Sequence, residues 1–439
     1  MEEKKAALGV EARESAIKRA LSYRWVVWGI MVFAFMIVFF HRLAAAVVRE
    51  DVTSAFSLSA TAFGAMSSMY FYAYMAMQIP VGLLADTLGA RITVSAGMFA
   101  AGAGSILFGF APSYIWLLAG RFLVGLGVAT VFACIMKIQS QWFRDREFAT
   151  LSGAMALIGN SGGILSQGPL ALLITIISWR SSFVGIGIMT LCVSFLCYVF
   201  IRNRPQDMGF PAINEREVLR EGRRNEAFSI SEGLRAVLSV KGVPAAACFY
   251  FFNQGGFFAL LGTWGTAWLV NVYGMSVSKA SSLMVMMVVG SMLGSIFTGW
   301  ISDRIGRRKL PMIIAAAIHT LLWSVILFSM EKSLSIFSIK TVFFLLGVTN
   351  SSFVLAWTVG KELSSEKYTA LTISVINTAG FLAIAILTSV MGMVIDFSAD
   401  LPVATAYRRA FSLGLLSSIF SVIFAFLVPE TSIFRQSKK

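Results

Sequence analysis

The chain has little charge and almost no histidine. Only 13% of its 439 residues are Asp, Glu, Lys or Arg, and only two are histidine, which is too few for a histidine-based zinc site. No Gly-x-x-x-x-Gly-Lys-Ser/Thr loop occurs, which disfavours an ATP-driven pump. The cysteines lie in apolar runs without paired spacing and therefore predict neither disulfides nor a metal site: Cys134, Cys192, Cys197 and Cys248.

Hydrophobic residues dominate instead. They make up 57% of the chain, and the mean hydropathy is +0.78, more apolar surface than a soluble domain can bury. Runs of about 20 apolar residues are long enough to cross a bilayer as helices. Twelve such runs predict an all-α membrane protein, at about residues 25–48, 61–85, 92–111, 114–138, 148–177, 181–201, 243–271, 280–302, 310–330, 338–360, 369–395 and 406–428.

One long polar gap divides these spans into six plus six. The predicted organisation is an N-terminal segment (1–24), a six-helix bundle (25–201), a central loop (202–242), a second six-helix bundle (243–428) and a tail (429–439). If the N-terminus is cytoplasmic, most of the Lys and Arg fall in cytoplasmic segments, so both termini and the central loop are placed there. We interpret the net charge of +14 as this topology signal and not as a nucleic-acid-binding face. The N-terminus lacks a signal-peptide pattern, which suits a bacterial inner membrane.

Two charged loops repeat at equivalent positions of the two halves. "GLLADTLGAR" (82–91) joins spans 2 and 3, and "GWISDRIGRRK" (299–309) joins spans 8 and 9. Such internal repeats are typical of secondary transporters. The repeat predicts a gating latch at the cytoplasmic helix ends, against the alternative of simple positive-inside anchoring. Its expected members are Asp86, Arg91, Asp303 and Arg307.

With "GRFLVGLG" (120–127), "GNSGGILSQGPL" (159–170) and "SWRSSF" (178–183), these loops resemble the major facilitator superfamily over nearly the whole chain. The resemblance implies two pseudo-symmetric six-helix bundles, alternating access, a monomer and no cofactor or metal. "FFHRLAAAVV" (39–48) and "YFYAYMAMQIPVGLLAD" (70–86), with "RPQDMGF" (204–210), resemble bacterial organic-anion and organophosphate carriers. The symporters of that group usually have Asp and Glu where this chain has His41 and Val128. Symport, exchange and uniport therefore stay open.

Arg42 lies deep in span 1, where a charge is costly and usually functional. A guanidinium can hold a carboxylate or phosphate in a bidentate pair, and in the resembling carriers the Arg at this position anchors the substrate. The alternative is a structural Arg bonded to backbone carbonyls. Tyr70, Tyr74 and Gln78 share one helix face, and a Tyr aligned with Tyr74 helps to bind the anion in those carriers. Further candidate ligands are Lys137, Asn160, Asn253, Gln254, Asn350, Trp357 and Asn377.

Two titratable residues are candidates for proton coupling. His41 is the type of side chain that titrates near neutral pH, although a packing role is equally open. Glu362 is a rare embedded carboxylate, which Lys361 would neutralise in the alternative interpretation. Arg121 matches the superfamily's span-4 Arg and is assigned to the gate. In span 7, Gly255 and Gly256 are expected to unwind the helix beside Asn253 and Gln254.

The sequence therefore predicts a secondary carrier of a small organic anion, held by Arg42 and Tyr74. An amino-acid or peptide carrier would use Arg42 for the carboxylate and Glu362 for the amine. A drug or metabolite exporter and a membrane sensor that binds without moving solute are further alternatives. An enzyme is not expected, because the Gly-x-Ser-x-Gly pattern at residues 159–163 falls within a predicted helix far from His319.

Overall fold

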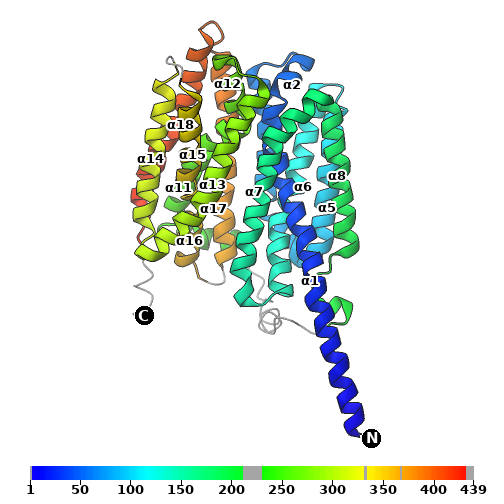
Figure 1. The fold of residues 1–439 in the computed structure, drawn as a ribbon. Coiled ribbons are helices and arrows are strands. Elements are labelled where there is room, and N and C mark those ends of the chain that lie inside the picture. Colours follow the sequence, from blue (N-terminus) through cyan, green and yellow to red (C-terminus); the bar gives the residue numbers. More distant parts are fainter. Residues whose placement is uncertain (1, 211–229, 331–333, 366–367, 432–439) are drawn as a thin grey trace.

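The computed structural model describes residues 2–210, 230–330, 334–365 and 368–431. Within these ranges the chain is almost entirely helical, and no residue is in a β-strand. The helices form two bundles that lie side by side, with both termini at one end (Figure 1). The predicted all-α architecture is therefore confirmed.

The helices follow one another with short connections. The first half contains α1 (Glu2–Val47), α2 (Arg49–Phe56), α3 (Ala60–Met77), α4 (Pro80–Thr87), α5 (Gly89–Gly109), α6 (Tyr114–Trp142), α7 (Asp145–Ile176) and α8 (Trp179–Phe200). The linking segment contains η1 (Pro205–Met208) and α10 (Ile230–Ser239). The second half contains α11 (Val243–Ala259), the π-helical η2 (Leu260–Trp264), α12 (Gly265–Tyr273), α13 (Val277–Ile305), α14 (Lys309–Phe328), α15 (Ile336–Asn350), α16 (Phe353–Leu363), α17 (Thr369–Asp396) and α18 (Val403–Leu427).

Eleven helical segments of the described chain are long and apolar enough to cross a membrane. The remaining predicted span, 61–85, is divided into α3 and α4. Pro80 is the first residue of α4, where its missing N–H is tolerated, because a proline inside a helix would remove a hydrogen bond. With this divided span, the described helices give the twelve passes that the sequence predicts.

The bundle has two ends. We call the end that carries the termini the terminus-side face and the opposite end, where α2 lies, the α2-side face (Figure 1).

The two halves pack closely against each other through α3 and α17. This contact begins at the α2-side face and continues into the bundle. A Cβ at Gly64 of α3 would lie 2.9 Å from the carbonyl oxygen of Thr388 on α17, so only glycine permits this approach. Nearby, the Ser68 hydroxyl donates to the Ala385 carbonyl at 2.8 Å.

The expected unwinding at Gly255 and Gly256 is wrong. Both glycines lie inside the continuous helix α11, and the irregular π-helical turn begins later, at Leu260. A Cβ at Gly256 would lie 3.1 Å from the Cα of Gly414, so this glycine permits close packing against α18. Glycine pairs often kink helices, but here they lie in a regular helix, and Gly256 allows that helix to pack closely against its neighbour.

Candidate functional site

The Arg42 guanidinium lies where helices of the two halves meet. Four aromatic rings surround it, with centroids 4.7 Å (Phe39), 5.4 Å (Tyr74), 5.2 Å (Phe381) and 5.9 Å (Phe258) from its central carbon. These rings come from α1, α3, α11 and α17 and therefore from both halves. The residue is 8% exposed. Aromatic faces attract a cation, so they hold the guanidinium in place.

Arg42 has no anionic partner in the described part of the chain. The hydroxyls of Tyr70 and Tyr74 interact with its guanidinium, but no described carboxylate forms an ion pair with it, and its Nε has no hydrogen-bond partner. A buried charge is costly unless an opposite charge compensates it. The site is therefore electrostatically incomplete without an anion.

A chain of hydrogen bonds crosses between the halves close to this site. Asn377 of α17 donates from Nδ2 to the Gln78 Oε1 at 3.0 Å. Its own Oδ1 accepts from the Tyr250 hydroxyl of α11 at 3.1 Å. Gln254 Nε2, one helical turn further, donates to the same Tyr250 hydroxyl at 3.4 Å. The Trp357 ring lies 5.7 Å from the Tyr250 ring.

The structure thus brings Tyr70, Tyr74, Gln254, Asn377 and Trp357 into the surroundings of Arg42. Sequence reasoning missed the rings of Phe39, Phe258 and Phe381 and one polar residue, Tyr250. The residue precedes Gln254 by four positions, so the i,i+4 spacing of a helix face would have found it.

Other candidate ligands are placed differently. Asn160 donates its amide to the Ala156 carbonyl of its own helix at 2.8 Å. Lys137 donates to the Ala85 carbonyl and pairs with Asp86 at 2.8 Å, on the terminus-side face. Asn253 and Asn350 are buried, and neither amide has a partner among the described residues. Such groups are usually satisfied by water or solute, so they are available to a polar ligand.

His41 and Arg121 belong to the packing within the first half. His41 Nε2 lies 3.2 Å from the Thr190 hydroxyl on α8, whereas its neighbour Arg42 contacts α3. Arg121 donates from NH1 to the His41 carbonyl at 3.0 Å, and its guanidinium carbon lies 4.9 Å from the Tyr70 ring. These contacts join α6 to α1, the helix that contains Arg42, and hold α1 in place.

The acids and arginines assigned to the latch have other partners in this structure. Asp86 pairs with Lys137 of α6, and Arg91 donates from Nε to the Tyr198 carbonyl at 2.8 Å and from its backbone N–H to Asn203 Oδ1. In the second loop Asp303 pairs with Arg308 and not with Arg307. Each of these contacts stays within one half.

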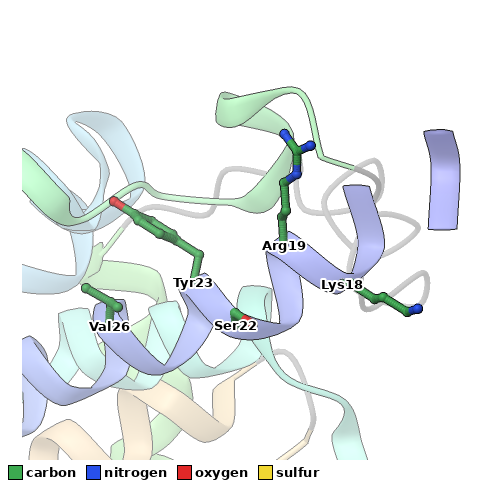
Figure 2. A pocket seen from close by; sticks show the side chains of 5 residues that line it. All are labelled: Lys18, Arg19, Ser22, Tyr23 and Val26. Atoms are coloured by element: carbon green, nitrogen blue, oxygen red, sulfur yellow. The ribbon is translucent and has the colours of Figure 1, made fainter. Parts of the chain in front are cut away.

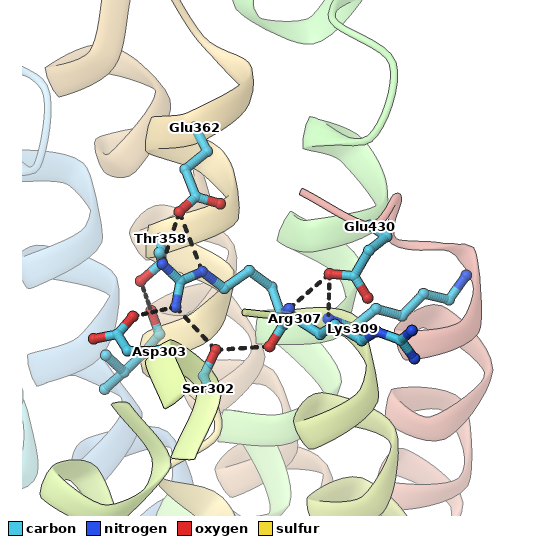
Figure 3. Close-up of polar contacts among 9 residues, drawn as sticks. Ser302, Asp303, Arg307, Lys309, Thr358, Glu362 and Glu430 are labelled. Carbon is cyan, nitrogen blue, oxygen red and sulfur yellow. Dashed lines mark hydrogen bonds and ion pairs between the residues drawn. The ribbon is translucent and has the colours of Figure 1, made fainter. Parts of the chain in front are cut away.

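Arg308 is the centre of a charged cluster on the terminus-side face. Figure 3 shows its partners Ser302, Asp303 and Glu362 from close by. Its Nε and NH2 donate to the same oxygen of Glu362 at 3.1 and 2.9 Å, and its NH1 donates to Asp303 and to the Ser302 hydroxyl. Burial lowers the pKa of Arg308, but the hydrogen bonds to Asp303 and Glu362 outweigh it, so the pKa lies above its ordinary value. Arg308, not Lys361, is therefore the partner of Glu362. The Glu430 carboxylate accepts from the backbone N–H groups of Arg308 and Lys309, at the start of α14.

A carboxylate of the second half caps a helix of the first half on the α2-side face. Asp396, at the end of α17, accepts hydrogen bonds from the backbone N–H groups of Ala60 at 2.9 Å and Thr61 at 2.7 Å, in the first turn of α3. A helix N-terminus favours an anion because its first N–H groups are free and its dipole is positive there. Asp396 was not among the residues that the sequence singled out.

We expect Asp396→Ala to weaken the contact between the two halves on the α2-side face. An N-terminal cap of this kind contributes about 0.5–2 kcal/mol, so the population of molecules whose halves are apart at this face should rise roughly 2- to 30-fold. Distances between spin labels placed on the two halves at this face would report the change. Asp400→Ala, which removes an exposed acid on the same face, is the matched control. Equal distance distributions for Asp396→Ala and wild type would show that this cap does not hold the halves together.

Two surface cavities lie away from the Arg42 site. One, of about 440 Å³, is at the terminus-side end of α1, as Figure 2 shows, and its lining is Lys18, Arg19, Ser22, Tyr23 and Val26. The other, of about 480 Å³, lies between α5 and α8. Neither contains a predicted substrate ligand. The case for the Arg42 site therefore depends on its charge and contacts and not on an open cavity.

Several related proteins match much of the chain. A probable sulfoacetate transporter of Cupriavidus necator is 22% identical over 92% of this chain and 95% of its own. A hexuronate transporter of Bacillus subtilis is 27% identical over 61% and 60%, and the membrane sensor protein UhpC of Escherichia coli is 25% identical over 60% and 61%.

The fold matches solved structures as well. A bacterial homologue of the human lysosomal transporter Spinster, in an inward-facing and unoccupied conformation, has a TM-score of 0.73, with 17% identity over 92% of this chain and 96% of that one. The sequence profile of the Major Facilitator Superfamily matches residues 27–388. The chain therefore belongs to the Major Facilitator Superfamily.

Proposed function

We propose that this protein is a secondary carrier of small organic anions and that Arg42 holds the carboxylate of the substrate. One observation carries the proposal: a guanidinium buried between the two halves, fixed by aromatic rings, that has no carboxylate partner among the described residues. Two relatives, a probable sulfoacetate transporter and a hexuronate transporter, support an anionic substrate. Tyr74, Gln254 and Asn377 would bind the polar remainder of the solute.

The arrangement of contacts between the halves supports alternating access. Contacts that join the halves extend from Asp396 and Ala60 on the α2-side face to Asn377 and Gln78 beside the Arg42 site. The ion pairs on the terminus-side face, such as Asp86 with Lys137, lie within single halves. The proposal therefore places the protein in a state closed on the α2-side. With the terminus-side face in the cytoplasm, as the distribution of Lys and Arg favours, this state is inward-facing.

The same geometry argues against an amine site at Glu362. That carboxylate is paired with Arg308, so it is not free to bind the ammonium of an amino acid in this conformation. His41 is likewise turned toward Thr190 and does not contact the anchor. In the carrier proposal, neither Glu362 nor His41 binds the substrate. The proposal does not depend on coupling to protons.

Counterflow in liposomes tests the proposal. Vesicles containing purified protein are loaded with an unlabelled anion, and uptake of labelled sulfoacetate, hexuronate and sugar phosphate is followed. We expect transient accumulation of at least one anion and none of a labelled zwitterionic dipeptide or cation. Accumulation of the dipeptide alone would favour the amino-acid or peptide carrier.

A membrane sensor is the second candidate, because the relative UhpC carries that name. A sensor would bind an anion without moving it. Thermal stabilisation by an anion, combined with no counterflow of the same anion, would support the sensor and overturn the carrier.

A further inference from the structure

A groove runs along the outer surface of the first half, between α5 and α8. Its volume is about 480 Å³, within the range of ligand pockets. Three exposed aromatic residues stand along it, Phe99 (61% exposed), Phe195 (66%) and Tyr198 (55%). On a membrane-spanning helix, exposed apolar side chains of this kind face lipid. The complete lining is Ile92, Ser95, Ala96, Phe99, Leu191, Ser194, Phe195 and Tyr198.

Both serine hydroxyls of the groove are engaged in hydrogen bonds. The Ser194 hydroxyl donates to the Ser95 carbonyl at 2.7 Å, which joins the two helices. The Ser95 hydroxyl in turn donates to the Arg91 carbonyl at 2.7 Å. With both hydroxyls engaged, the groove presents mainly hydrocarbon and aromatic surface, which suits an acyl chain.

A fixed cation lies at the terminus-side end of the groove. The Arg91 guanidinium carbon is 4.7 Å from the Tyr198 ring, and its Nε donates to the Tyr198 carbonyl at 2.8 Å. Its two terminal nitrogens have no partner in the ranges that the structure describes, and they are not buried. Along α5, eight residues separate Arg91 from Phe99, or about 12 Å at 1.5 Å per residue.

We propose that this groove binds one anionic phospholipid, with an acyl chain between Phe99 and Phe195 and the phosphate on Arg91. The charge distribution selects this occupant, because the site combines a cation at the level of the headgroups with an apolar groove that extends into the bilayer. The fork of terminal N–H groups left free on Arg91 matches the oxygens of a phosphate. The site is separate from the Arg42 site and does not depend on its function.

Native mass spectrometry of the purified protein tests the proposal. Protein is titrated with phosphatidylglycerol, which is anionic, and with phosphatidylcholine, which is zwitterionic. We expect wild type to retain phosphatidylglycerol preferentially and Arg91→Gln to bind it about fivefold more weakly. Ala96→Phe, which fills the groove at an exposed position, should weaken binding of both lipids. Melting temperatures of the variants verify that each one is folded.

Arg304→Gln is the matched control, because Arg304 also lies on the terminus-side face and, like Arg91, stacks on an aromatic ring, that of Trp300. It should bind phosphatidylglycerol as wild type does. Equal binding by wild type and Arg91→Gln would overturn the proposal. So would displacement of the lipid by millimolar inorganic phosphate, because Arg91 would then be a site for free phosphate and the groove would contribute nothing.

Discussion

Arg42→Gln should lower the affinity for the organic anion by roughly 30-fold or more. Removing one partner of a buried charge pair costs about 2–5 kcal/mol. Arg42→Lys keeps the charge but loses the planar fork, so it should bind more weakly than wild type and more tightly than Arg42→Gln. Binding is measured by calorimetry or thermal shift, and transport by counterflow, with the anion that stabilises the wild type.

The second prediction concerns the stability of the same variant, which should not fall although its affinity does. In the absence of ligand, Arg42→Gln should melt no lower than wild type, because it removes a buried cation that has no ion-pair partner among the described residues. Asn160→Ala is the control, since that amide bonds only to its own helix, and it should change affinity little. If Arg42→Gln lowers the melting temperature sharply and binds the anion as wild type does, Arg42 is a structural residue and the proposed site is wrong.

Arg308→Met should destabilise the protein by about 2–4 kcal/mol, the largest stability effect that we expect from a single charged residue here. Its side chain is only 7% exposed and its partner Glu362 only 16%, so the substitution leaves a nearly buried carboxylate without a cation. Asp303 contributes little because its side chain is 67% exposed. Thermal or denaturant unfolding in detergent measures the loss.

Three further variants isolate the pair. Arg307→Met removes the neighbouring arginine of the same loop and should cost less than about 0.5 kcal/mol. Lys361→Met should also cost little, because Arg308 and not Lys361 neutralises Glu362. The double variant Arg308→Met with Glu362→Gln should recover much of the loss, since it removes both charges. A loss for Lys361→Met as large as that for Arg308→Met would contradict this pairing.

The sequence by itself determined the number of passes and the division into two halves. A bilayer demands about 20 consecutive apolar residues for each helix, and this constraint acts on each segment separately. The division of span 2 between α3 and α4 was not predicted, although Pro80 lies at the break. A charge such as Arg42 inside an apolar run is equally local information, so the residue that we propose as the anchor is visible without a structure.

Helical spacing within one segment was similarly readable. Tyr70 and Tyr74 are four residues apart, and the structure places both against Arg42. The same spacing applied to Gln254 would have added Tyr250. Such arguments reach only as far as one helix face, because spacing says nothing about which other helix that face contacts.

Only the tertiary structure decided the charge pairs. Asp86 pairs with Lys137, which is 51 residues away, and Arg308 pairs with Glu362, which is 54 residues away. Arg307 and Arg308 are adjacent and identical in chemistry, and both lie in the connection between α13 and α14. The packing of the helix ends therefore determines which of the two arginines reaches the carboxylate.

The surroundings of Arg42 were likewise decided by tertiary structure. Phe39, Tyr74, Phe258 and Phe381 are spread over more than 300 residues of sequence, yet their rings converge on one guanidinium. That convergence depends on how the two halves meet through α3 and α17, where small residues such as Gly64 allow contact. The sequence therefore specifies where Arg42 lies along its own helix, because membrane insertion acts on each segment separately. The packing between the halves specifies which side chains surround Arg42, because close packing acts on pairs of helices.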